Sequence, residues 1–248
     1  MVAHALEEKK ALIIGGSRGI GAAIVKRFAR EGAAVAFTYA KSHEAARALV
    51  TSVKESGARV TALCADSADA EALAKAVDDS VKALGGLDIV VNNAAIFTFG
   101  NVSDYSLADF DRMLAVNVRG VFVAAKAAAR HLPPGGKIIV IGSNSARRGF
   151  MPGAAVYGMT KAAVARLVAG LALDFAERKI SVIDVQPGPT TTDMTPTDEA
   201  IRASIANATL EKRIADPDEI ARFVTYLASP QSTFITGVSL TIDGGYSV

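Results

Sequence analysis

A tyrosine and a lysine lie one helical turn apart in the segment "YGMTK", which runs from Tyr157 to Lys161. Residues four apart share one face of a helix. A lysine ammonium beside a phenol favours the phenolate and lowers its pKa from about 10. Such a pair predicts a group that gives and takes a proton near neutral pH. The spacing alone also fits an ordinary helix with one surface lysine, so the remaining segments decide between the two interpretations.

A glycine-rich turn near the start of the chain offers a second kind of chemistry. The segment "GGSRGIG" follows an apolar run and precedes an amphipathic one. Glycines let the backbone turn tightly and approach a pyrophosphate, which then lies at a helix N-terminus. The spacing GxxxGxG differs from the common GxGxxG, and any strand-to-helix turn favours glycine, but this position between strand and helix predicts dinucleotide binding. The residues expected to contact the dinucleotide here are Gly15, Ser17, Arg18, Gly19, Ile20 and Gly21.

The next turn bears on the choice between NADH and NADPH. An NAD site places an acid about 20 residues beyond the glycines, on the ribose hydroxyls. Here "FTYAKSHE" has no acid between Gly32 and His43, and the predicted contacts are Tyr39, Ala40, Lys41 and Ser42. Cations at Lys41 and Arg18 suit a 2′-phosphate, so we expect NADPH/NADP+; the alternative is that both cations are solvated surface groups.

Short apolar runs alternate with amphipathic segments along the whole chain. The runs at 11–15, 33–40, 58–65, 87–93, 137–143, 180–188 and 237–245 predict strands, and helices are expected between them, including long ones at 107–132 and 155–177. Alternation of this kind predicts βαβ units and a parallel sheet with helices on both faces. We therefore expect one doubly wound α/β domain over residues 1–248, with ligands beyond the carboxyl ends of its strands.

Several further candidates follow directly after predicted strands. Asp66 and Ser67 are expected at the adenine edge, although Ser67 could instead cap the next helix. The small residues in "NNAAI" would let a cofactor approach closely, and "PGPTTTDM" is a polar turn able to hold a nicotinamide amide. The remaining candidate cofactor contacts are Asn93, Ala94, Ala95, Pro187, Gly188, Thr190 and Thr192, and Ser143 ends the fifth predicted strand.

Composition narrows the class of protein. The chain has 248 residues, half of them hydrophobic, and a net charge of +2, which does not suggest a nucleic-acid partner. Its one cysteine and three dispersed histidines do not suggest a metal site. The start has no apolar stretch typical of a signal peptide, and no uninterrupted apolar run reaches the ~18 residues of a membrane span. We expect a cytoplasmic protein with no membrane partner.

In combination, these motifs resemble the single-domain short-chain dehydrogenase/reductases over almost the whole chain. They occur in that family's order: the GxxxGxG turn, an NNAG-like segment, Asn117 in "VNVRG", a serine after the fifth strand, YxxxK, and PG after the sixth. The resemblance implies a Rossmann fold with strand order 3-2-1-4-5-6-7 and usually a homotetramer. It implies that Tyr157 exchanges a proton with the substrate oxygen, that Lys161 lowers its pKa and binds the nicotinamide ribose, that Ser143 polarises the carbonyl, and that Asn117 holds a water in a proton relay.

The sequence departs from the family pattern at the serine. The usual separation of thirteen residues before the tyrosine would select Asn144, whereas Ser143 and Ser145 lie fourteen and twelve residues before Tyr157. We select Ser143 because it directly ends a strand. The same fourteen-residue spacing occurs in a bacterial member of the family linked to cyclic-di-GMP binding and biofilm dispersal, which this chain resembles closely.

Two functions follow. The first is NADPH-dependent reduction of a small-molecule ketone, aldehyde or 3-oxoacyl group, and the second is a cyclic-dinucleotide-binding regulator on the same scaffold. Residues about 190–210 are expected to form a mobile lid over the substrate. Apolar residues on loops near the predicted site would either form a wall against the substrate or pack only among themselves. The wall candidates are Phe97, Phe99, Phe150, Met151 and Met194.

Overall fold

Seven apolar segments form one parallel sheet at the centre of the molecule. The computed structural model describes residues 4–149 and 151–248, and the strands run in the order β3-β2-β1-β4-β5-β6-β7, as predicted. Every strand pair in the sheet is parallel. The strands are β1 Lys10–Ile14, β2 Ala34–Tyr39, β3 Val60–Cys64, β4 Ile89–Asn92, β5 Lys137–Ile141, β6 Ser181–Pro187 and β7 Val238–Ile242.

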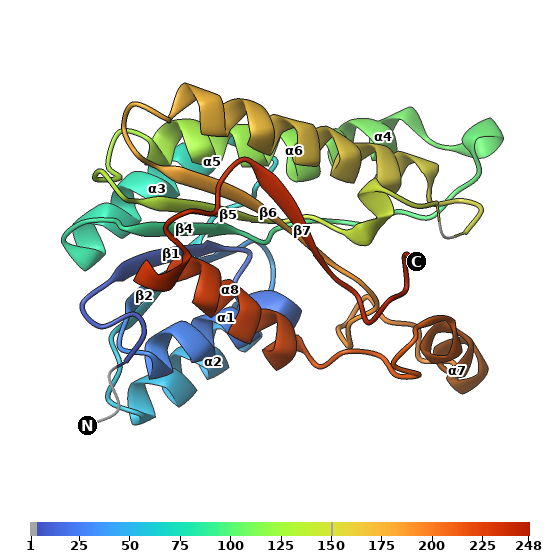
Figure 1. The fold of residues 1–248 in the computed structure, drawn as a ribbon, viewed down its shortest axis with the longest axis horizontal. Coiled ribbons are helices and arrows are strands. Elements are labelled where there is room, and N and C mark those ends of the chain that lie inside the picture. The colour runs from blue at the N-terminus through green and yellow to red at the C-terminus, as the bar shows by residue number, and fades with distance from the viewer. Residues whose placement is uncertain (1–3, 150) are drawn as a thin grey trace.

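Helices cover both faces of the sheet, as Figure 1 shows. One face packs against α1 Gly19–Arg30, α2 His43–Glu55 and α8 Pro217–Ala228. The other packs against α3 Ala70–Leu84, α5 Gly120–Ala128 and α6 Ala155–Asp174. Each face has its own hydrophobic core, built from the Val, Ile and Leu side chains of the strands. Burial on both faces explains why the strands are almost continuously apolar in sequence.

The predicted helical tract at 107–132 is divided in the structure. It begins as α4, Leu107–Leu114, widens into the π-helical turn η2, Ala115–Arg119, and continues as α5. A π-helical turn adds a residue to the helix circumference and occurs frequently at functional sites. This one contains Asn117, which is turned into the protein and is almost fully buried.

The segment between β6 and α8 stands out from the layers. It carries α7, Glu199–Ala208, a helix with no buried residue, which projects away from the sheet in Figure 1. Its base is held to the fold by a parallel bridge between Thr190 and Ala215. Three short 3-10 turns complete the elements: η1 Val102–Asp104, η3 Asn144–Ala146 and η4 Pro230–Ser232.

Helix α6 is more apolar than we expected from the sequence. Among the described residues it is the one helix long and apolar enough, by length and composition, to cross a membrane, with a mean hydropathy of 1.3 over 18 residues, of which 33% are buried. The core helix of a water-soluble protein meets the same criterion, and α6 packs on the sheet through Val164, Val168 and Leu171.

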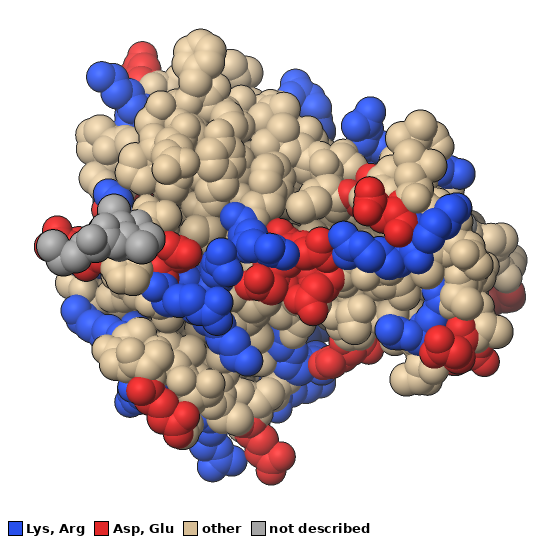
Figure 2. Space-filling view, turned by 60° about the horizontal axis from the view of Figure 1, so that its bottom comes forward, with Lys and Arg blue, Asp and Glu red and all other residues tan. Residues whose placement is uncertain are grey.

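Charged residues are mixed in sign on the face of the molecule shown in Figure 2, where basic and acidic side chains are interspersed. Several of the surface charges are paired within the chain, for example Arg27 with Asp218 and Arg213 with Glu219.

Candidate active site

The carboxyl ends of the strands open into a groove of about 540 Å³. Parallel strands bring the turns that follow them to one edge of the sheet, and the predicted cofactor and catalytic residues meet there, except Gly21 and Asn117. The groove is lined by Gly15, Ser17, Arg18, Gly19, Ile20, Tyr39, Ala40, Lys41, Ser42, Asp66, Ser67, Asn93, Ala94, Ala95, Ser143, Tyr157, Lys161, Pro187, Gly188, Thr190 and Thr192.

The glycine-rich turn forms the floor at one end of the groove. Gly15 has a positive φ of 75°, and a Cβ there would lie 2.8 Å from the Cα of Ala94. Gly21 does not line the groove; a Cβ on it would lie 2.2 Å from the Gly15 carbonyl oxygen. Asn93 Nδ2 donates to that same carbonyl at 2.7 Å. The missing side chains therefore let the turn close onto β4 and leave bare backbone facing the groove.

Tyr157 and Lys161 enter the groove from α6. The Lys161 side chain is 4% exposed, and its Nζ donates to the Ile141 carbonyl at 2.9 Å and lies 5.7 Å from the centroid of the Tyr157 ring. Burial lowers the pKa of Lys161 from 10.5 to about 8, although the charge of Asp184 opposes this change. Lys161 is thus a buried ammonium that loses its proton not far above neutral pH.

The pKa of Tyr157 is opposite in direction to our prediction. Burial of the phenol raises its pKa above 10, and a hydrogen bond with Ser143 offsets this only in part. The Lys161 ammonium lies over the ring, 5.7 Å from its centroid, and makes its hydrogen bond to the backbone instead of the phenol oxygen, so desolvation of the phenolate dominates. At neutral pH the phenol therefore keeps its proton, which is the form needed to donate one.

Ser143 is the serine that meets Tyr157, as the sequence reasoning selected. It is buried at the start of η3, where its Oγ accepts from the Ser145 backbone N–H at 3.1 Å and lies 2.8 Å from Ser145 Oγ. Asn144, which the usual spacing would select, is turned away and donates to Asp243 Oδ2 at 3.3 Å. The fourteen-residue spacing thus still brings a hydroxyl to the phenol.

Asn117 lies behind the groove and does not line it. Its Oδ1 accepts from the Ile96 N–H at 2.8 Å, and its Nδ2 donates to the Ile96 carbonyl at 2.9 Å and to Thr160 Oγ1 at 3.2 Å. These bonds tie the π-helical turn to the segment after β4 and to the residue that precedes Lys161. Its predicted role in a proton relay stays a prediction.

An ion pair closes the end of the groove beyond β3. Arg112 of α4 donates to both oxygens of Asp66, at 3.0 and 2.7 Å. Burial raises the pKa of Asp66, but hydrogen bonds from the Ala68 N–H and from Arg112 outweigh it and lower the pKa overall. The alternative that Ser67 caps the next helix is wrong, because Asp69 caps α3 by accepting from the N–H groups of Glu71 and Ala72.

A second ion pair crosses the groove. Arg18 of the glycine-rich turn donates to Asp193 Oδ2 at 2.9 Å, although the two are 175 residues apart in sequence. Apolar side chains lie nearby: Phe97 packs edge-to-face on the Tyr157 ring, with centroids 5.0 Å apart, and Met194 lines the groove. Phe99 and Met151 are exposed, whereas Phe150 lies outside the described residues.

Sequence reasoning missed several groove residues. Thr38 accepts the Gly15 N–H on its Oγ1 at 3.0 Å, and Arg112 and Asp193 make the two ion pairs just described. Thr38 lies inside an apolar strand and Arg112 inside an amphipathic helix, so neither has a local signal in the sequence. Asp193 belongs to the polar turn "PGPTTTDM", which was recognised as a candidate. Its negative charge, expected at the same edge of the sheet as the cation of the glycine-rich turn, was the signal that could have identified it. The other missed lining residues are Ala65, Ile96, Val116, Ile141 and Gly142.

Comparison with known proteins agrees with this arrangement. The family model described as "Enoyl-(Acyl carrier protein) reductase" matches residues 14–247. A cyclic-di-GMP-binding biofilm dispersal mediator protein of Escherichia coli is 43% identical, covering 96% of this chain and 97% of its own. A short-chain dehydrogenase/reductase from Serratia marcescens is 53% identical with a TM-score of 0.96, covering 99% of this chain and 100% of its own. A short-chain dehydrogenase from Burkholderia cenocepacia, solved in complex with NADP, is 46% identical with a TM-score of 0.96, covering 98% of this chain and 100% of its own. The shared fold and these matches along nearly the full length show that the chain belongs to the short-chain dehydrogenase/reductase family of oxidoreductases.

Proposed function

We propose that this protein is an NADPH-dependent reductase that converts a ketone, aldehyde or 3-oxoacyl group to an alcohol. The observation that carries the proposal is the meeting of Ser143, Tyr157 and Lys161 on the wall of a groove floored by a glycine-rich turn. A phenol that keeps its proton, a hydroxyl beside it and a buried ammonium behind it supply what carbonyl reduction needs from a protein.

The groove fits an NADP-type dinucleotide. The bare backbone of the glycine-rich turn, at the start of α1, suits a pyrophosphate. Arg18, Lys41 and Ser42 line the part of the groove next to β2 and suit a 2′-phosphate, while Asp66 lies beyond β3 where an adenine edge would lie. The relative from Burkholderia cenocepacia was solved with NADP, which supports the same choice here.

NADPH, when bound, supplies the hydride, and every other step falls to the chain's own residues. Ser143 donates a hydrogen bond to the carbonyl oxygen and polarises it. As negative charge develops on that oxygen, Tyr157 gives it the phenolic proton. The Lys161 ammonium then stabilises the phenolate that remains until it is protonated again. Removing the phenol should therefore remove most of the chemical rate.

The test is the loss of NADPH absorbance with a panel of carbonyl compounds. We expect Tyr157→Phe to lose about 10²–10⁴-fold in kcat, the usual contribution of a general acid. Tyr226→Phe is the matched control, because Tyr226 is exposed on α8 and does not line the groove. Full activity in Tyr157→Phe would refute the mechanism.

We further propose that residues 190–210 act as a lid over an apolar substrate. Helix α7 has no buried residue and so little to hold it in one place. The ion pair between Arg18 and Asp193 joins this segment to the glycine-rich turn, and Met194 faces the groove. Phe97, against the Tyr157 ring, suits an aromatic or apolar substrate beside the reacting oxygen.

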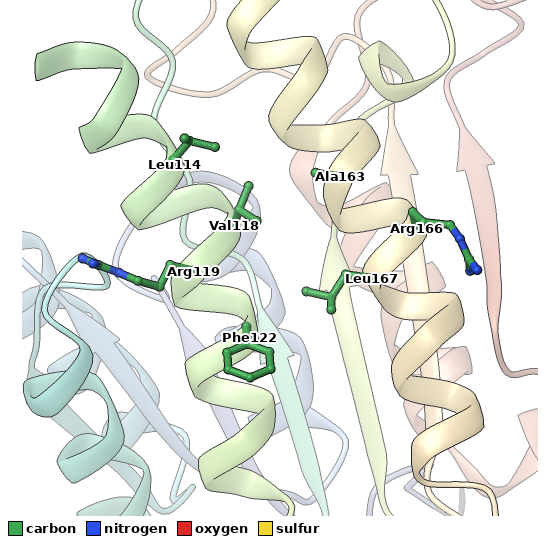
Figure 3. Close-up of a pocket in the computed structure, with 7 residues that line it drawn as sticks. All are labelled: Leu114, Val118, Arg119, Phe122, Ala163, Arg166 and Leu167. Atoms are coloured by element: carbon green, nitrogen blue, oxygen red, sulfur yellow. The ribbon is translucent and has the colours of Figure 1, made fainter. Parts of the chain in front are cut away.

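We also propose that the protein is a cytoplasmic homotetramer. A groove between the α4–α5 tract and α6 is lined mainly by apolar residues, and the stick view in Figure 3 shows the side chains of both helices bordering it. It consists of Leu114, Val118, Arg119, Phe122, Ala163, Arg166 and Leu167. A second copy of this chain would bury the same apolar face of α6 that the sheet leaves uncovered. The edge strand β7, near the fully exposed Phe234, offers the second interface of a tetramer.

A second candidate function rests on the Escherichia coli relative named for cyclic-di-GMP binding, which is 43% identical. In this alternative the chain binds a cyclic dinucleotide as a regulator. Titration calorimetry with cyclic-di-GMP, with and without NADPH, distinguishes the two. Tight binding that NADPH does not displace, together with no carbonyl reduction, would favour the regulator.

A further inference from the structure

Strand β6 contains an acid that the proposed mechanism does not use. Asp184 is fully buried, in register with Val140 of β5 and Ser239 of β7. Its Oδ2 accepts from Ser239 Oγ at 2.7 Å and from Gln186 Nε2 at 2.9 Å. Among the described residues its Oδ1 is buried without a hydrogen-bond partner, and the nearby Gly142 N–H, which donates to the Val185 carbonyl, lowers the pKa of the carboxyl. A buried carboxylate with one unpaired oxygen is costly for folding, so its presence calls for a reason.

The carboxylate lies at the point that the Lys161 ammonium approaches from α6. Lys161 Nζ binds the carbonyl of Ile141, the last residue of β5. The next residue is Gly142, and a Cβ on it would lie only 2.2 Å from Asp184 Oδ1. Asp184 alternates with Ile183 and Val185 and so faces the α6 side of the sheet, as Val182 does. Both charges therefore lie on that side, next to the backbone of Ile141 and Gly142, with no hydrogen bond between them.

We propose that Asp184 is a positioning residue for the reaction, whose buried carboxylate keeps the ammonium of Lys161 charged. The role rests on the proposed reductase function, because it is in that reaction that Lys161 must carry a positive charge beside a phenolate. Burial favours the neutral amine of Lys161, and the negative charge of Asp184 opposes that tendency. Burial raises the pKa of Asp184 above its usual value, and the hydrogen bonds from Ser239 and Gln186, the charge of Lys161 and the Gly142 N–H oppose this in part by favouring the ionised carboxylate.

The other charged groups around this pair are engaged elsewhere. Tyr157 shares α6 with Lys161 and keeps its proton. Asp243, just beyond β7, binds Asn144 and the backbone N–H groups of Gly245 and Ser247. Lys137, at the opposite end of β5, donates to Ser232. The guanidinium of Arg119, at the end of η2, donates to the Ala68 carbonyl. Asp184 is thus the acid that acts on Lys161 from within the sheet.

The charge coupling is measured directly in the ligand-free chain. Lysine labelled with ¹³C at Cε reports protonation by its chemical shift, and the Lys161 signal is assigned by its loss in Lys161→Met. In Asp184→Asn, one oxygen remains to accept from Ser239 and Gln186, but the charge is gone. Removing a neighbouring opposite charge at an effective dielectric constant of about 20 moves a pKa by roughly one unit. We expect the Lys161 midpoint to fall by about that amount in Asp184→Asn.

Ser239→Ala is the matched control, because it removes a hydrogen bond to Asp184 but keeps the charge. Its Lys161 midpoint should stay within a few tenths of a unit of the wild-type value, and an equal fall in both variants would overturn the proposal. So would an unmoved midpoint in Asp184→Asn. Should that variant not fold, the ¹³Cγ shift of Asp184 in the wild-type chain decides: a carboxyl that is still protonated where Lys161 titrates would also overturn the proposal.

The pH profile of reduction gives a second measurement. If Asp184 sustains the charge of Lys161, the alkaline limb of kcat/KM moves to lower pH in Asp184→Asn by the same amount as the NMR midpoint. A uniform loss of activity at every pH would indicate a merely structural role and contradict the proposal. A shifted NMR midpoint in a chain that reduces no carbonyl would refute the proposed function and leave the charge coupling intact.

Discussion

Replacing Lys161 by methionine is expected to stabilise the folded chain, and to do so less as the pH rises. The side chain is 4% exposed, and burial lowers its pKa from 10.5 to about 8. Between these two values the unfolded chain binds more protons than the folded chain, so the free energy of unfolding of the wild type rises with pH in this window. Methionine has a similar length and no charge to bury.

The size of the effect follows from the pKa shift. The difference between 10.5 and about 8 corresponds to about 3 kcal/mol. This is the amount by which the buried ammonium lowers the free energy of unfolding of the wild type at pH 7. At pH 10 the folded lysine is neutral and the unfolded one is only partly charged, so less than about 1 kcal/mol of that cost remains. The variant also leaves Asp184 without its positive neighbour, which reduces the gain at pH 7. The change with pH, about 2 kcal/mol, is therefore the firmer quantity.

Urea unfolding of both chains without ligand at pH 7, 8, 9 and 10 measures this difference. The free energy of unfolding of the wild type, minus that of Lys161→Met, should increase steadily across the series. Lys126→Met serves as control, since Lys126 is exposed on α5 and its replacement removes a lysine that is not buried. A flat difference for Lys161→Met would show that the ammonium is not desolvated as the structure implies.

Three further outcomes are expected. Gly142→Ala should lower the free energy of unfolding, measured in urea, by about 1–3 kcal/mol, because the new methyl overlaps Asp184 Oδ1. The loss should be smaller in a chain that also has Asp184→Ala, and strictly additive losses from the two substitutions would contradict this. Arg18→Ala should raise KM for NADPH about tenfold but not for NADH, by loss of a charge-assisted bond to phosphate, whereas an equal rise for both would refute its 2′-phosphate role. Phe122→Asp should reduce the assembly mass measured by light scattering, and an unchanged mass would exclude the α6 interface.

The fold was predictable because its signals are local. Each strand is an apolar run bounded by glycine or polar residues, as in "KIIVIGS", and each intervening segment has a helical pattern. Once the strands are parallel, their carboxyl ends must converge, so a list of residues after each strand is already most of a site. Ser143 was found in this way, whereas Tyr157 and Lys161 were found from their spacing on one helix and from the family motif, and the groove brings the three together.

The features that escaped prediction depend on contacts between distant segments. The tract at 107–132 has the pattern of one helix, and its π-helical turn is accompanied by bonds from Asn117 to the backbone of Ile96, 21 residues earlier. The direction of the Tyr157 pKa was wrong because spacing says that a lysine is near but not whether solvent is excluded. Burial is a property of the packed fold, and here it outweighs the neighbouring charge.

The aspartate in β6 could have been noticed from the sequence, although the periodicity of its strand does not reveal it. Strand β6, "SVIDVQP", is otherwise uncharged and is buried over nearly its whole length, and an aspartate there should be among the most destabilising choices. The glycine at position 142 leaves room for this aspartate, because any Cβ there would overlap the carboxylate. The two positions therefore depend on each other across neighbouring strands. Lys161 on α6 likewise keeps a charge out of water, at a cost to the stability of the fold. When two groups that can carry opposite charges are buried beside one strand end, and that strand end leads into the proposed site, function is a better explanation than stability for both.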